Sequence, residues 1–154
     1  MSDNVEIEYK DFGLKNLVKM LKADDIPQAR VGILGGKNAR KDDGSNASIG
    51  AKHEFGDDGM PIRSFLRIPL SENFQKYLET AGLNKETMEQ ILKNGEFINM
   101  IRKLGVLGEK IVLDAFDSGG FGKWKPSNMK FKKNHQTLVE TQQLRDSITS
   151  DVVG

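Results

Sequence analysis

The sequence predicts a small α+β domain in which one long helix lies across a sheet of a few strands. Alternating apolar segments, typical of strands with one buried face, occur near residues 5–10, 29–34 and 147–153. A broad apolar stripe at helical spacing runs from residue 97 to residue 116, and shorter helical patterns precede it. We therefore expect a small mixed or antiparallel sheet packed against two or three helices, one of them long.

The length and composition are those of one domain with its own core, spanning residues 1–154, with 37% hydrophobic and 29% charged residues. The net charge of +1 favours neither nucleic acid nor a membrane surface as a partner. There is no cysteine, which excludes disulfides, thiol catalysis and cysteine-ligated metals. The acidic first residues do not form a signal peptide, and no run approaches the roughly 20 apolar residues of a membrane span. We expect a protein made in the cytoplasm that works there or leaves it within an assembly.

The first part of the chain predicts a strand at residues 5–10, a helix over 14–21 that ends before Pro27, and a second strand at 29–34. Residues 37–46 contain no large apolar side chain, which predicts an exposed, mobile loop. A phosphate-binding loop requires glycine, four residues and then Gly-Lys-Ser/Thr, and this segment does not match it.

The next segment combines several local signals. Ser45 or Asn46 can cap a short helix, and Gly56 suits the left-handed residue at its end. Residues 57–59 have turn chemistry, and Pro61 prevents the helix from resuming. Four large apolar side chains follow and are expected to be buried: Ile62, Phe65, Leu66 and Ile68.

Three helices are then predicted, over 69–82, from a cap at Asn84 to Asn94, and over 97–116. Gly105 and Gly108 lie inside the last helix, where each costs roughly 1 kcal/mol against alanine. Close approach of another backbone, in this chain's sheet or in a neighbouring subunit, would compensate for that cost.

Residues 117–136 are rich in glycine, lysine and asparagine, which predicts a second long, mobile loop. Thr141 can cap a short helical turn that holds Leu144, and a final strand follows at 147–153.

Three motif blocks occur in order between residues 53 and 148. The first is His53-Glu54-Phe55-Gly56 followed by Pro61-Ile62-Arg63-Ser64-Phe65-Leu66-Arg67. It resembles the H-E-F-G … I-P-x-R-x-F-L-R core of tailed-phage neck proteins, the virion-morphogenesis or tail-completion family. The second, residues 119–126, resembles that family's G-F-x-x-W-x-P. The third, residues 138–148, resembles its L-V-D-T-G-x-L-R-x-S-I.

Two positions depart from the family pattern. Glu140 replaces an aspartate, which is a mild change. Gln142 replaces a glycine, so the resemblance alone does not predict that the local turn is kept.

The resemblance implies a structural virion protein at the head–tail junction that completes the tail and joins it to the head. It implies a ring, hexameric in the family, assembled in the host cytoplasm and in contact with the tail terminator or tail tube and with the head connector. A tail terminator that caps the tail tube is an alternative. The candidate protein-interface residues are His53, Glu54, Phe55, Arg63, Phe65, Arg67, Phe121, Trp124, Leu144 and Arg145.

The basic, aromatic stretch 121–135 supports a different alternative, a DNA-binding accessory protein. Aromatic rings can stack on bases while lysines meet phosphates. Alternatively, these aromatic residues anchor the loop to the body of the protein or to a partner ring. The candidate DNA-facing residues are Lys123, Lys125, Lys130, Lys132 and Lys133.

We expect no enzymatic activity, cofactor or metal. A zinc protease needs a second histidine four residues after the first, and residue 57 is an aspartate. No spacing argues for a metal site that combines His53, Glu54 and His135. We expect instead that His53 is half exposed and that Glu54 pairs with an arginine or lysine. Asp114 is expected on the solvent side of the long helix, and no serine-nucleophile motif occurs.

Overall fold

The computed structural model describes residues 15, 18–19, 22, 26–40, 44–125 and 142–154. In that part the fold is α+β, as predicted. Its elements are β1 (Gln28–Ile33), the 3-10 helix η1 (Gly35–Lys37), α2 (Asn46–Phe55), α3 (Arg67–Thr80), α4 (Lys85–Lys93), α5 (Phe97–Asp117), α6 (Gln143–Asp146) and β2 (Ile148–Val153).

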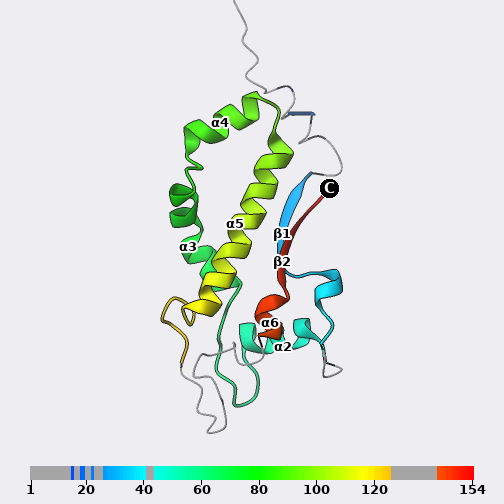
Figure 1. The fold of residues 1–154 in the computed structure, drawn as a ribbon, viewed down its shortest axis with the longest axis vertical. Coiled ribbons are helices and arrows are strands. Elements are labelled where there is room, and N and C mark those ends of the chain that lie inside the picture. The colour runs from blue at the N-terminus through cyan, green and yellow to red at the C-terminus, as the bar shows by residue number, and fades with distance from the viewer. Residues whose placement is uncertain (1–14, 16–17, 20–21, 23–25, 41–43, 126–141) are drawn as a thin grey trace, which may run out of the picture.

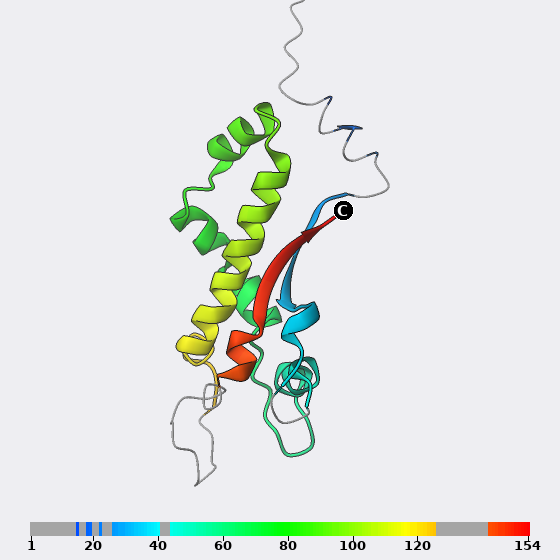
Figure 2. The ribbon, with the colours of Figure 1, turned by 45° about the vertical axis from the view of Figure 1, so that its right-hand side comes forward.

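The sheet consists of β1 and β2, which pair antiparallel from Gln28 opposite Val153 to Ile33 opposite Ile148. Both strands were predicted, and the antiparallel alternative is confirmed. Figure 2 shows the two strands running together alongside α5. The strand predicted at residues 5–10 lies outside the described residues, as does most of the helix predicted over 14–21.

The long helix α5 is the centre of the molecule and lies between α3 on one side and the sheet on the other (Figure 1). Its inward face includes Ile111, Val112 and Phe116, which are fully buried. Phe65, Leu144 and Ile148 complete the core around the C-terminal part of α5. The predicted apolar stripe therefore marks the buried face of this helix.

The two glycines of α5 allow the helix to lie close to the sheet of the same chain. A Cβ at Gly108 would lie 2.9 Å from Cγ2 of Val31, and a Cβ at Gly105 would lie 3.3 Å from the Cβ of Ala29. Real Cβ atoms do not come as close as the first of these distances. The close backbone approach predicted from the sequence is confirmed, and the partner is the sheet of this chain.

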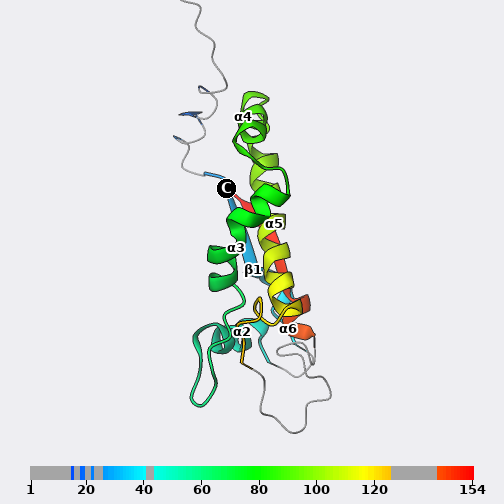
Figure 3. The same ribbon diagram turned by 90° about the vertical axis from the view of Figure 1, so that its left-hand side faces the viewer.

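The molecule is elongated. α4 lies at one end of the long axis, and α2, α6 and the turn after α2 lie at the other (Figures 1 and 3). The two ends therefore present different surfaces.

The exposed loop predicted over residues 37–46 is wrong at its C-terminal end, whereas Lys37, Ala39 and Gly44 are exposed as predicted. Asn46 is only 3% exposed, and its amide donates to the carbonyl oxygens of Lys37 and Ala39 at 3.0 and 3.3 Å. Ser45 caps α2, as predicted, by accepting a hydrogen bond from the N–H of Ser48. The side chain of Asn46 thus connects the start of α2 to residues 37–39. Residues 41–43 lie outside the described part.

The predicted loop 117–136 begins as compact turns against α5. The N–H of Gly120 donates to the carbonyl oxygen of Ala115 at 2.6 Å, and the N–H of Trp124 donates to that of Gly119 at 3.0 Å. Residues 126–136 lie outside the described part.

Candidate functional site

Glu54 is buried near the end of α2, and its carboxylate receives hydrogen bonds from the start of α3. Oε2 accepts from the N–H groups of Phe65 and Leu66 at 2.9 and 3.0 Å. Oε1 accepts from the Ser64 hydroxyl at 2.6 Å and from the N–H of Arg67 at 3.1 Å. Arg67 is the predicted cationic neighbour, with its Nε 3.6 Å from Oε1, but the main partners are backbone groups.

This arrangement follows from the physics of a helix start. The first N–H groups of a helix lack partners within it, and the positive end of the helix dipole attracts a carboxylate. Ser64 adds a further acceptor, since its hydroxyl oxygen receives the N–H of Ile68 at 3.0 Å. Glu54 therefore fixes the end of α2 to the start of α3.

The second motif block meets the first at this point. Arg63, only 7% exposed, donates from Nε to the carbonyl oxygen of Lys125 at 3.3 Å. The indole N–H of Trp124 donates to the carbonyl oxygen of Ser64 at 3.0 Å. Its ring meets Phe116 edge to face, with centroids 5.8 Å apart. Trp124 therefore contacts the body of the protein, which is one of the roles considered for the aromatic residues of this stretch.

The third motif block closes the same unit. Leu144 packs in the core cluster that contains Phe65. Arg145 donates two hydrogen bonds of 2.9 Å to the carboxylate of Asp117 at the end of α5, which lowers the pKa of that carboxyl group. Gln142 has a φ of 54°, so the left-handed turn that glycine would favour is kept with a glutamine.

Four candidate interface residues are buried inside the protein, so their assignment to a surface interface is wrong: Glu54, Arg63, Phe65 and Leu144. Two others, Phe121 and Trp124, are half-buried, and the Phe121 ring lies edge-on to Tyr77 at 6.5 Å. His53 is half-buried, as expected. Only Phe55 and Arg67 remain largely exposed, with the guanidinium 5.6 Å from the centroid of the phenyl ring.

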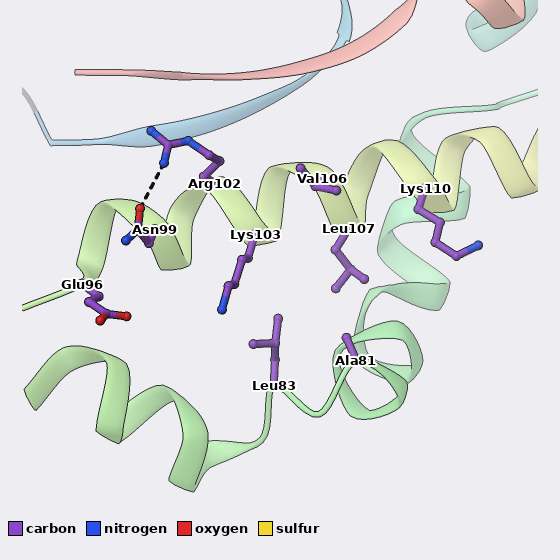
Figure 4. A pocket seen from close by; sticks show the side chains of 9 residues that line it. All are labelled: Ala81, Leu83, Glu96, Asn99, Arg102, Lys103, Val106, Leu107 and Lys110. Atoms are coloured by element: carbon purple, nitrogen blue, oxygen red, sulfur yellow. Dashed lines mark hydrogen bonds between the residues drawn. The ribbon is translucent and has the colours of Figure 1, made fainter. Parts of the chain in front are cut away.

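Two exposed apolar surfaces were not predicted. Ile62 and Ile68 were expected to be buried, but they are 58% and 37% exposed, and Phe55 at the end of α2 is 66% exposed. The other surface is a groove of about 570 Å³ between α5 and the turn from α3 to α4. Figure 4 shows Leu107 and Lys103 of α5 projecting toward Ala81 and Leu83 across this groove.

Asp114 is not simply on the solvent side of α5 as predicted. Its carboxylate accepts a hydrogen bond from the Tyr77 hydroxyl at 2.6 Å, which links α5 to α3, and one from the Lys110 ammonium of the same helix at 2.8 Å. Burial, and then this carboxylate, raise the pKa of Tyr77 to about 12. The group tethers the two helices.

Of the candidate DNA-facing lysines, the structure describes two. Lys123 forms an ion pair with Glu72, and Lys125 is exposed. Lys130, Lys132 and Lys133, together with His135, lie outside the described residues. Within the described part, no group of three or more histidine, aspartate or glutamate side chains is arranged to hold a metal ion.

Comparison with protein families, with curated proteins and with solved structures finds no match to this chain. Among the described residues, no helix combines the length and apolar character needed to cross a membrane.

Proposed function

We propose that this chain is a structural subunit of the neck of a tailed phage, which completes the tail and joins it to the head. The observation that carries the proposal is the meeting of the three motif blocks. They are far apart in the sequence, but hydrogen bonds and core contacts join them around the start of α3. Their convergence on one structural unit supports the resemblance.

The local structure also gives a physical reason for the motif positions. Glu54 accepts hydrogen bonds from the backbone N–H groups of residues 65–67. Trp124 donates a hydrogen bond to the carbonyl oxygen of Ser64, the residue just before them. Gly56 has a φ of 85°, which favours glycine at the exit from α2. These positions support a shared fold rather than a shared catalytic site.

A neck subunit acts through its surfaces. The exposed apolar side chains lie on two different parts of the molecule, and contacts between unlike surfaces close into rings when the rotation permits. In this proposal the subunit forms a ring, hexameric by family resemblance, between the tail terminator or tail tube and the head connector, in the virion. Chemistry on a substrate plays no part.

The test is to delete the gene in the producing phage and to label purified particles with gold-tagged antibody against this chain. The proposal predicts label at the head–tail junction, and filled heads with separate finished tails in the deletion. Adding the purified protein should join them. Tails of uncontrolled length would instead favour a tail terminator.

Label only at the distal tip would reject the neck location. If intact particles carry no label and the chain is missing from their mass spectrum, the structural proposal fails. DNA binding that falls steeply with salt would then favour the accessory-protein alternative.

A further inference from the structure

We propose that copies of this chain associate head to tail, with the turn at residues 55–62 of one copy seated in the α5 groove of the next. The α5 groove is the hollow lined by Ala81, Leu83, Glu96, Asn99, Arg102, Lys103, Val106, Leu107 and Lys110. The proposal deepens the proposed function, since it identifies the contact that would build the ring.

The 55–62 turn carries apolar side chains that its own chain does not cover. Phe55 is 66% exposed and Ile62 is 58% exposed. Ile62 lies against Gly56, where its Cγ1 is 3.1 Å from the position of a Cβ. Ile62 therefore lies against the residue that follows Phe55 in the chain.

This turn is held in one shape. The N–H of Met60 donates to the carbonyl oxygen of Asp57 at 2.8 Å, and the N–H of Arg63 donates to that of His53 at 2.7 Å across its base. A surface that is already ordered loses less conformational entropy on binding. The turn is thus suited to act as a rigid insert.

Its charge is acidic. Asp57 pairs with Lys52 at 2.9 Å. The carboxylate of Asp58 makes no ion pair within residues 26–40, 44–125 and 142–154. One exposed negative charge is therefore available beside the apolar pair.

The α5 groove has the complementary character. Its apolar lining includes Val106, which is 58% exposed on the helix. Lys103 and Arg102 are exposed beside it, and in the described part of the chain neither pairs with a carboxylate; Arg102 donates to the side chain of Asn99 at 3.0 Å. Lys110 is already engaged by Asp114. Glu96 also lines the groove and is exposed. The groove therefore offers an apolar floor with two cations not paired to a carboxylate, Arg102 and Lys103, and one carboxylate, so positive charge is in excess.

Size and position agree with this pairing. A hollow of about 570 Å³ lies in the range of roughly 300–1,000 Å³ typical of ligand pockets, enough for apolar side chains to enter. The 55–62 turn follows α2 at one end of the long axis, and the groove lies toward the α4 end (Figures 1 and 4). One copy can therefore offer its turn to one neighbour and its groove to another, which is a heterologous contact.

The test uses one variant on each surface, Ile62→Glu and Val106→Glu, measured by light scattering after size exclusion. The unmodified chain should form an oligomer, with a mass of two or more times 17.2 kDa. Each variant alone should fall to a single 17.2 kDa protomer, because a glutamate would be buried in the contact. An equimolar mixture should recover dimers, since one variant keeps an intact turn and the other an intact groove.

Ile98→Glu is the matched control. Ile98 is 38% exposed on α5 but does not line the groove, so its substitution should leave the mass unchanged. Circular dichroism should match the unmodified chain for all three variants. Thermal unfolding should match it for Ile98→Glu, and the two monomeric variants should melt lower because they lose the stabilisation that association supplies.

A charge exchange gives a second test. Asp58→Lys and Lys103→Asp should each weaken association at least tenfold, and the combined variant should regain most of the affinity.

A monomeric unmodified chain overturns the proposal, as does an oligomer whose mass neither variant changes, or a mixture that stays monomeric. These results are separable from the neck assignment. Label at the head–tail junction with a failed mass test keeps the neck and rejects this contact. A passed mass test with no label keeps the contact and rejects the neck.

Discussion

Replacing Glu54 with glutamine tests whether one side chain fixes α2 to α3. The substitution keeps the shape of the side chain, but its amide nitrogen cannot accept a hydrogen bond. The four donors are arranged as two pairs, one on each oxygen. The remaining carbonyl oxygen can serve one pair, so two donors at this buried position lose their acceptor.

The expected cost follows from these contacts. Each unsatisfied buried donor costs about 1–3 kcal/mol. Loss of the negative charge at the helix start adds about 0.3–1 kcal/mol. We expect the free energy of unfolding to fall by about 2–7 kcal/mol, a large part of the 5–15 kcal/mol of a typical domain. The melting temperature should fall by roughly 4–28 °C.

The assay is chemical and thermal unfolding, with amide hydrogen exchange at Phe65, Leu66 and Arg67 as the local readout. Glu89→Gln is the control, because Glu89 is half exposed and its nearest lysine nitrogen is 3.9 Å away. That substitution should change stability by less than about 0.5 kcal/mol. Equal stability of the two variants, with unchanged exchange at the three amides, would refute the role given to Glu54.

Three further predictions concern single contacts. Gly108→Ala should lower the free energy of unfolding in urea by about 1–3 kcal/mol, because the added Cβ would meet Val31. Combining it with Val31→Ala, which removes the two methyl groups, should restore part of this stability. A Gly108→Ala variant more stable than the unmodified chain would contradict the close approach. Gln142→Gly should raise the melting temperature by about 2–4 °C, because it relieves a left-handed φ of 54°; an unchanged or lower value would argue against strain there. The raised pKa of Tyr77 means that its stabilising contribution is complete below the ordinary tyrosine pKa of about 10 and is lost as the pH rises toward about 12. Between those pH values, the free energy of unfolding in urea should fall less with rising pH for Tyr77→Phe than for the unmodified chain. An equal fall for both proteins would rule out this linkage.

The elements of the fold with local signals could be predicted from the sequence. Asn84 caps α4 through a hydrogen bond from Thr87, and the apolar stripe of α5 marks its buried face. Both features depend on residues within a turn or two of each other. The antiparallel sheet was one of two alternatives, since two separate alternating segments do not reveal their pairing direction.

The role of Glu54 could not be read in this way. Its partners lie ten to thirteen residues later, and nothing local indicates that the chain folds back onto the end of α2. Phe65 and Leu144 were taken for interface residues because a family motif marks a position without indicating which way its side chain faces. The exposure of Ile62 was missed because an apolar residue in an extended segment favours burial by default.

The pairing of β1 with β2 also has a consequence for how the chain folds. Arg30 and Asp151, which face each other across the two strands, are 121 residues apart in sequence. Contacts of such long separation form slowly, because a large loop must close before any favourable interaction is gained. While the chain is being synthesised, α5 can form and meet α3 and β1, but the part of its inward face that packs against β2 stays uncovered until residues 148–153 have left the ribosome.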